Sequence, residues 1–186
     1  MRVASCLVLL LALALTGCAA PRVVVLSDPL DAREHNDLGV SYEAAGKTDL
    51  ALQAYAAAAG KDPSWDQPLI NRGNALAATG NWPEAETAYR QALQRNPRNP
   101  EAMNNLAFAL LNRGKAADAL EWSARALDRE PDNPVFMATR AQALAASGEK
   151  AAALDLLRDA LEGLPAGAPL RGEIDTLRKR IDDTAP

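Results

Sequence analysis

Residues of the same type return every 34 positions along most of this chain, which has 186 residues. Glycine returns four times at one register, and small residues, alanines and prolines keep the same interval at four other registers. The five columns are Gly46, Gly80, Gly114 and Gly148; Gly39, Gly73, Ala107 and Ala141; Ala51, Ala85, Ala119 and Ala153; Ala58, Ala92, Ala126 and Ala160; and Pro63, Pro97, Pro131 and Pro165. This interval predicts an array of small units, because such a unit buries its apolar face only by stacking on the next copy.

Each unit is predicted to contain two antiparallel helices. The chain is rich in Ala, Leu, Glu and Arg, which enter helices at low cost. The Gly46 column supplies the left-handed residue that closes a first helix, and the Pro63 column ends a second helix. Gly39 is expected to face Ala51, because a small side chain lets two helices approach closely. The expected first helices span 32–45, 67–79, 100–113 and 134–147, and the second helices span 48–61, 83–95, 116–129 and 150–163.

Local signals predict where several helices begin and where the array ends. Asp31 and Glu34 have the spacing of a capping box, and the Asn-Pro pairs that begin at Asn99 and Asn133 combine an N-cap with a first-turn proline. A ninth helix is expected over 169–183, with four apolar residues on one face. These residues are Leu170, Ile174, Leu177 and Ile181. This helix is predicted to cover the apolar side of the last repeat.

The first unit resembles the tetratricopeptide repeat (TPR) in the residues Leu38, Gly39, Tyr42, Ala51, Tyr55, Ala58 and Pro63. The resemblance implies an all-α fold, a right-handed superhelix of four helix-turn-helix repeats followed by a C-terminal capping helix. The implied units are 32–65, 66–99, 100–133 and 134–167, with the capping segment at 168–186. Later units depart from the pattern at Arg72 and Arg140, and at Ser123 and Leu157, which replace the aromatic residue.

The N-terminal segment has the features of an export signal. A basic start, the apolar run 7–15 and the sequence Leu15-Thr16-Gly17-Cys18 follow one another, and the run is too short to span a bilayer. The sequence resembles the lipobox of bacterial lipoproteins, which implies a signal peptide at 1–17, a lipid on the Cys18 thiol and a tether over 18–31. Ala19 resembles the residue of lipoproteins sorted to the outer membrane, with the chain on the periplasmic face. An ordinary secretory peptide cleaved near Ala20 stays open as the alternative, as does anchoring in the inner membrane or a Gram-positive cell membrane.

Few residues could perform chemistry. The sequence has neither a phosphate-binding Gly-x-x-x-x-Gly-Lys-Ser/Thr motif nor a His-Glu-x-x-His motif, and His35 is the single histidine. We interpret His35 as a packing residue of the first helix. A net charge of −4 argues against a broadly basic nucleic-acid-binding protein. We predict no enzymatic activity, no metal, no small-molecule substrate and no cofactor besides the covalent lipid on Cys18.

The TPR resemblance places a peptide-binding groove on the concave surface, which the first helices line. The candidate residues are Arg33, Asn36, Asn71, Asn74, Asn104, Asn105, Phe108, Asn112 and Gln142. An Asn side chain offers one acceptor and two donor hydrogens, so a row of them could hold the backbone of an extended peptide. The alternative is that these amides are solvated or bond within the array. Lys and Arg are scarce at these positions, which disfavours an acidic C-terminal tail as the ligand.

These features together predict a membrane-anchored periplasmic scaffold that binds a segment of a partner protein. Small TPR lipoproteins of this kind resemble components of type IV and Tad pilus assembly, including pilotins. They also resemble adaptor lipoproteins for peptidoglycan-modifying enzymes, which is the alternative function; a hydrolytic enzyme is a disfavoured third. Three tryptophans lie off the usual repeat positions, and we expect them to fill gaps between helix ends; they are Trp65, Trp82 and Trp122.

Overall fold

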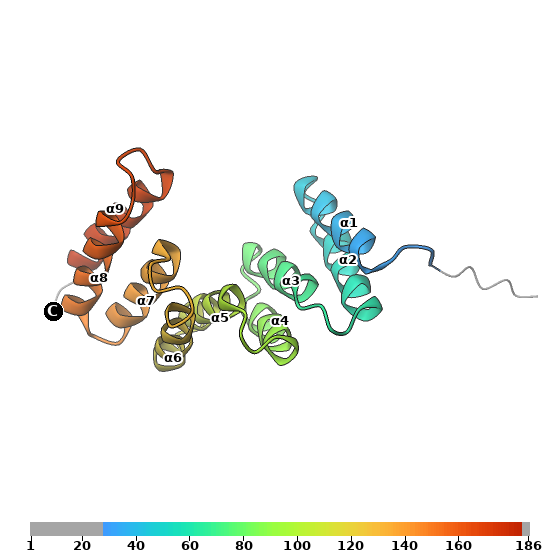
Figure 1. The fold of residues 1–186 in the computed structure, drawn as a ribbon, viewed down its shortest axis with the longest axis horizontal. Coiled ribbons are helices and arrows are strands. Elements are labelled where there is room, and N and C mark those ends of the chain that lie inside the picture. The colour runs from blue at the N-terminus through green and yellow to red at the C-terminus, as the bar shows by residue number, and fades with distance from the viewer. Residues whose placement is uncertain (1–27, 184–186) are drawn as a thin grey trace, which may run out of the picture.

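The computed structural model describes residues 28–183, and this part of the chain consists of nine α-helices and contains no strand (Figure 1). The helices are α1 (Ala32–Ala44), α2 (Thr48–Lys61), α3 (Gln67–Ala78), α4 (Trp82–Arg95), α5 (Pro100–Asn112), α6 (Ala116–Leu127), α7 (Pro134–Ala146), α8 (Lys150–Glu162) and α9 (Pro169–Asp182). These bounds lie within two residues of the predicted ones. The predicted signal peptide, Cys18 and most of the tether lie outside the described residues.

The helices form antiparallel pairs that succeed one another along a single axis from α1 to α9 (Figure 1). Within the described chain, the backbones of consecutive first helices also lie close together, from α1·α3 through α7·α9, whereas those of consecutive second helices do not. The first helices therefore lie closer together and line the inner face of the superhelix. We call this inner face, formed by α1, α3, α5, α7 and α9, the first-helix face.

The predicted helix ends are confirmed. Asp31 and Glu34 form the reciprocal capping box at α1, and the Asn99 and Asn133 side chains accept backbone N–H groups at the starts of α5 and α7. All four glycines of the Gly46 column have φ between 70° and 86°, the left-handed region that closes each first helix. The repeat geometry is thus written into local backbone chemistry at each turn.

The structure adds a residue to one predicted helix crossing. The atoms nearest to Gly39 belong to the ring of Tyr55, one turn after Ala51 on α2: a Cβ at position 39 would lie 2.5 Å from Tyr55 Cε1. Gly73 lies under Tyr89 in the same way, at 2.4 Å. Glycine is required there because the ring fills the space that any larger side chain would need. In the third and fourth units, Ala107 and Ala141 stand at the glycine position, and Ser123 and Leu157 stand at the ring position.

Hydrogen bonds and ion pairs join the first repeat to the second and the second to the third. The Arg95 guanidinium donates to the backbone carbonyls of Ala59, Asp62 and Trp65, at 2.8–3.2 Å, at the C-terminal end of α2. A cation is favourable at this end because the helix dipole is negative there. Glu86 of α4 forms ion pairs with Arg90, Arg113 and Lys115, of which the last two lie in the next repeat. These contacts fix the angle between units.

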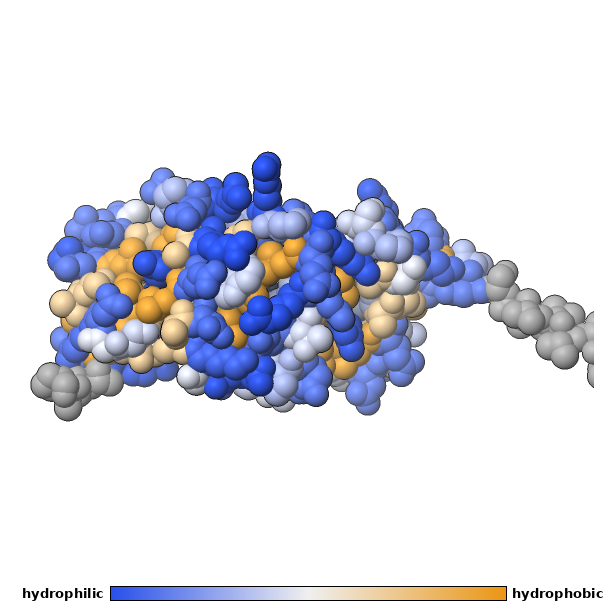
Figure 2. Space-filling model, turned by 90° about the horizontal axis from the view of Figure 1, so that it is seen from below, coloured by the Kyte–Doolittle hydropathy of each residue, from blue (hydrophilic) through white to orange (hydrophobic). Residues whose placement is uncertain are grey.

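The ninth helix covers the last repeat, as predicted. Ile174, Leu177 and Ile181 of α9 are buried in one apolar cluster with Leu144 of α7 and Leu157 of α8. The surface seen in Figure 2 is mostly polar, with apolar areas between the polar residues and a broader one toward one end of the molecule. None of the helices in the described region is long and apolar enough to cross a bilayer.

Candidate functional site

The N-terminal part of the first-helix face is closed by amide pairs. Asn71 Nδ2 donates to Asn36 Oδ1 at 2.8 Å, and Gln67 Nε2 donates to Asn71 Oδ1 at 3.0 Å. Asn36 is only 8% exposed. The first bond joins α3 to α1 and the second lies within α3, so these predicted groove residues bond within the array. Arg33, the other predicted residue of this region, is exposed to solvent.

In the middle of the face, Asn74 is also engaged. Its Oδ1 accepts two bonds, from the Tyr89 hydroxyl at 2.8 Å and from Asn105 Nδ2 at 3.0 Å. Burial and, to a smaller extent, the negative charge of Glu101 raise the pKa of Tyr89, so the hydroxyl stays protonated and donates. Asn74 and Asn105 thus link α3, α4 and α5, and their hydrogen bonds to each other and to Tyr89 lie within the array.

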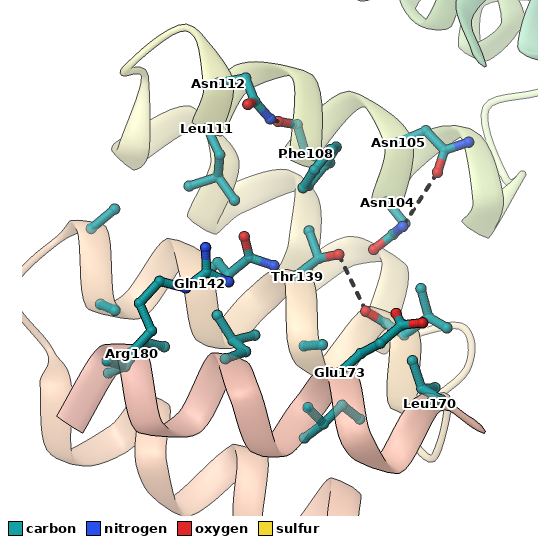
Figure 3. A pocket seen from close by; sticks show the side chains of 17 residues that line it. Asn104, Asn105, Phe108, Leu111, Asn112, Thr139, Gln142, Leu170, Glu173 and Arg180 are labelled. Atoms are coloured by element: carbon teal, nitrogen blue, oxygen red, sulfur yellow. Dashed lines mark hydrogen bonds between the residues drawn. The ribbon is translucent and has the colours of Figure 1, made fainter. Parts of the chain in front are cut away.

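Asn104 differs from the other asparagines. It is 5% exposed, and its Oδ1 is the single buried side-chain oxygen or nitrogen in the described residues that has no hydrogen-bond partner. The reason is the residue one repeat further on. Asn71 bonds to Asn36, but the position equivalent to Asn71 is occupied by Thr139, whose hydroxyl donates to Val135 O of its own helix at 3.2 Å. Figure 3 shows the Asn104 side chain directed from α5 toward Thr139 of α7.

A hollow of about 1010 Å³ lies between α5, α7 and α9, and Asn104 is part of its wall (Figure 3). Its apolar lining includes Phe108, Val135, Leu170, Ile174 and Leu177. Phe108 and Val135 are 38% and 46% exposed, among the most exposed large apolar side chains of the described chain. The volume lies at the upper end of the range for ligand-binding pockets.

Aromatic packing holds Phe108 in place. Its ring makes an edge-to-face contact with Trp82, with centroids 5.8 Å apart and an interplanar angle of 78°. Its carbonyl accepts a bond from Asn112 Nδ2 at 2.9 Å. Trp82 and Trp122 pack against the main apolar core, as expected for gap-filling residues, and Trp122 also lies under the guanidinium of Arg125 at 4.0 Å. The Trp65 side chain is half-buried.

Two charged residues lie at opposite ends of the hollow. Glu173 and Arg180 are the charged members of its lining, both belong to α9, and both are exposed. Neither forms a hydrogen bond or ion pair with any residue that the structure describes. Gln142 of α7 lies between them on the opposite wall (Figure 3). The hollow therefore has an apolar centre and a charge of opposite sign at each end.

The structure brings together only part of the predicted site. Asn104, Asn105, Phe108, Asn112 and Gln142 line the hollow, whereas the other predicted groove residues lie outside it. The sequence does not predict that α9 lines the hollow, because the pattern of its apolar residues indicates only that this helix covers the last repeat. The sequence did contain a signal for this contribution. Two residues of opposite charge, Glu173 and Arg180, flank the buried Ile174 and Leu177 on the same helix.

A family model for the tetratricopeptide repeat matches residues 22–65 and 70–134, which is more than half of the chain, and a second one matches residues 134–159. The chain belongs to the tetratricopeptide repeat family. Among curated proteins, none matches the sequence. TPR proteins are in general scaffolds for protein–protein interaction rather than enzymes.

Solved TPR structures share the fold. MamA from Desulfovibrio magneticus RS-1 (residues 41 to the end) is 18% identical, with a TM-score of 0.69 over 82% of this chain and 86% of that one. TTC0263, a TPR protein of Thermus thermophilus, is 21% identical, with a TM-score of 0.66 over 81% and 80%. The first TPR of Spaghetti (RPAP3), solved bound to the HSP90 peptide SRMEEVD, is 22% identical, with a TM-score of 0.62 over 67% and 99%.

Two other titratable side chains of this TPR array, His35 and Glu86, are buried and have polar partners. His35 is 8% exposed and its Nε2 lies 2.5 Å from Asp28 Oδ2, which agrees with its interpretation as a packing residue. Burial alone would raise the pKa of Glu86, but hydrogen bonds from Arg90, Lys115 and Arg113 hold it below its usual value. Within residues 28–183, no group of three His, Cys, Asp or Glu side chains could hold a metal ion.

Proposed function

We propose that this TPR protein is a membrane-anchored periplasmic scaffold that holds a segment of a partner protein on its first-helix face. The hollow between α5, α7 and α9 carries the proposal, because it combines half-exposed apolar side chains with polar groups at its edge. This mixture is typical of a binding site, in which apolar contact supplies affinity and a few polar groups fix orientation. We propose no enzymatic activity.

The peptide-bound RPAP3 structure supports a peptide ligand, since it shows a related array of repeats occupied by a short segment. That ligand is rich in Glu and Asp. The lining of the hollow in this chain contains one basic residue, Arg180, one acidic residue, Glu173, and several amides. We therefore propose a ligand of mixed charge for this chain instead of an acidic tail.

The proposed membrane attachment rests on the sequence Leu15-Thr16-Gly17-Cys18 and the apolar run before it. A lipid on Cys18 would keep the repeats close to the membrane, since the segment 18–31 spans at most about 45 Å when extended. Labelled palmitate should enter the wild-type protein in bacterial cells and be absent from Cys18→Ser, which should leave the membrane fraction. Equal labelling of both proteins would overturn the anchor.

The proposed cellular role is assistance in assembling an envelope machine such as a pilus or a secretion system. Its support is the combination of the lipoprotein-like N-terminus with a TPR array. The direct test is photocrosslinking in the cells that produce the protein, with benzoylphenylalanine at Val135 of the hollow. Leu50 of α2 is a matched control, because it is an apolar residue of similar exposure, 40% against 46%, on a second helix.

We expect an adduct with a partner protein from position 135 and none from position 50. The partner's identity then decides between the assembly role and the adaptor role for peptidoglycan-modifying enzymes. Adducts formed from position 50 alone, or from neither position, would overturn binding on the first-helix face.

A further inference from the structure

The chemistry of the hollow defines what kind of segment it takes, provided that the first-helix face binds a partner as proposed above. We propose that the hollow between α5, α7 and α9 binds an extended peptide that donates a backbone N–H to Asn104 Oδ1. A central apolar side chain of this peptide lies against Phe108 and Leu177. A basic residue toward one end faces Glu173, and an acidic residue toward the other end faces Arg180.

The buried acceptor of Asn104 is the first argument. The same register holds Asn36, Ile70, Asn104 and Ala138 in the four units. Asn36 Oδ1 is satisfied by Asn71, and Ile70 is fully buried, so an apolar residue fits this register when no partner exists. Asn104 is similarly buried, and although its Nδ2 donates to Asn105 Oδ1 at 3.3 Å, its Oδ1 lacks a partner in the described chain. Buried polar atoms are almost always hydrogen-bonded, which makes this exception a place for a ligand's donor.

The donor requirement selects the conformation of the ligand. In the middle of an α-helix every backbone N–H already bonds to the carbonyl four residues earlier. An extended segment has free N–H groups along its length, as in a strand that has not yet paired. A neutral amide N–H also suits an uncharged acceptor such as the Asn104 amide oxygen. The orphaned oxygen thus favours an extended peptide over an amphipathic helix.

The apolar centre and the two charges set the sequence of the ligand. Glu173 and Arg180 are seven residues apart on α9, which places their Cα atoms about 10 Å apart along the helix axis. An extended peptide covers this distance in three to four residues, at about 3.3 Å each. Residues two apart in an extended chain point to the same side. A basic residue, an apolar residue and an acidic residue at alternate positions therefore match Glu173, the apolar centre and Arg180.

The probe is the blocked heptapeptide acetyl-Ser-Lys-Ser-Leu-Ser-Asp-Ser-amide, titrated into the full chain and followed by the tryptophan fluorescence and amide NMR shifts of residues around the hollow. We expect saturable shifts at Phe108, Thr139 and Leu177. A peptide with N-methyl groups on the Leu and the following Ser lacks the central N–H donors and should bind at least tenfold more weakly. Replacement of Lys and Asp by Gln should weaken binding several-fold and remove its dependence on salt.

The decisive variant is Asn104→Leu, which keeps the branched shape and removes both the acceptor and the Nδ2 donor that bonds to Asn105 Oδ1 at 3.3 Å. We expect about tenfold weaker binding of the heptapeptide together with a Tm close to that of the wild type, because relief of the unpaired buried acceptor offsets the loss of this one long hydrogen bond. A purely structural role for Asn104 would instead lower the Tm along with the affinity. Full affinity in this variant would overturn the proposal, as would equal affinity for the N-methyl peptide. Preferential binding of a stapled helical peptide with the same charges would also overturn it.

The outcomes separate this inference from the proposed function. If photocrosslinks form from position 135 in cells but the heptapeptide does not bind, the first-helix face binds a partner of different chemistry and this inference alone fails. If the heptapeptide binds to purified protein but no crosslink forms in cells, the hollow has the stated chemistry and the proposed cellular role fails. If neither is observed, both fail.

Discussion

Asparagine has different roles in the two halves of the first-helix face. Between α1 and α3, the amides of Asn36 and Asn71 bond to each other and close the surface. Between α5 and α7, Asn104 stands at the same register as Asn36, but Thr139 replaces the amide that would reach it. The difference between Asn71 and Thr139 therefore decides whether the asparagine one repeat earlier is bonded across the repeats or keeps an unpaired acceptor. In a repeat protein, function can arise at a position where one copy differs from the others.

The interior of the two halves also differs, and this difference gives the largest expected effect. Gly73→Ala places a Cβ within about 2.4 Å of the Tyr89 ring, so the ring must move. Overpacking of this kind costs about 1–3 kcal/mol, which should appear as a lower Tm in thermal unfolding. The double variant Gly73→Ala/Tyr89→Ser reproduces the pair of the third unit, Ala107 and Ser123, and removes the clash. If Gly73→Ala alone unfolds at the wild-type temperature, the close ring contact is not as tight as described.

The boundary between the halves is held by Glu86, whose loss should have the next largest effect. Glu86→Gln removes charge-assisted bonds from Arg90, Arg113 and Lys115 and should lower the free energy of unfolding at pH 7 by about 2 kcal/mol. Because the pKa of Glu86 is lowered in the folded chain, its stabilisation is complete above the usual value of 4.5 and is lost as the pH falls through the folded pKa.

Urea unfolding of both proteins between pH 7 and pH 3 measures this difference. The gap between wild type and Glu86→Gln should be constant from pH 7 to about pH 5 and should shrink toward pH 3. A gap that grows as the pH falls would contradict the assigned role of Glu86.

The amide pair of the N-terminal half can be broken by one substitution. Asn36→Leu leaves Asn71 Nδ2 without its acceptor and should destabilise the protein by about 1–2 kcal/mol. The matched substitution Asn104→Leu removes an acceptor that bonds nothing in the described chain, together with one long hydrogen bond from Nδ2 to Asn105 Oδ1 at 3.3 Å, so it should change the stability much less than Asn36→Leu does. Thermal unfolding of the two variants side by side checks this difference. Equal losses would mean that Asn104 is satisfied in the folded protein.

The smallest expected effect comes from converting the C-terminal half into the N-terminal one. Thr139→Asn restores at α7 the residue that bonds to Asn36 from α3, and its amide should reach Asn104 Oδ1. One additional hydrogen bond should add about 1 kcal/mol to the free energy of unfolding and should weaken heptapeptide binding, since the acceptor is then occupied. Paired measurements of Tm and peptide affinity test the exchange. A variant that gains stability and keeps full affinity would separate Asn104 from the ligand.

The fold could be predicted from the sequence because its determinants are local and periodic. The glycines that close each first helix and the Asp31, Asn99 and Asn133 caps act within a few residues, so spacing alone locates them. The spacing placed Gly39 near Ala51 but did not reveal the ring of Tyr55 over it, because the direction of this ring depends on packing in three dimensions.

The sequence predicted which face of the array carries the site but not which residues of that face are available to a ligand. The TPR pattern places the asparagines on the first helices, but which amide bonds to which depends on partners 31 or 35 residues away. The sequence left two interpretations of the asparagines open, and for Asn36, Asn71, Asn74 and Asn105 the structure shows bonds within the array. The part played by Glu173 and Arg180 required the position of α9. The lipid on Cys18 stays a prediction.

The glycine–tyrosine contacts of the first two units have a consequence for how such a gene can be rearranged. Gly39 lies on a first helix and the ring that covers it lies on the second helix of the same unit. A crossover between whole units carries both partners along and preserves each contact. A crossover inside a unit could join Ala107 to the ring of Tyr89, which has no room for it, or Gly73 to Ser123, which would leave a void. Duplication and exchange of whole units are therefore favoured. The boundaries of past recombination events are expected at the prolines between units rather than at the glycine turns within them.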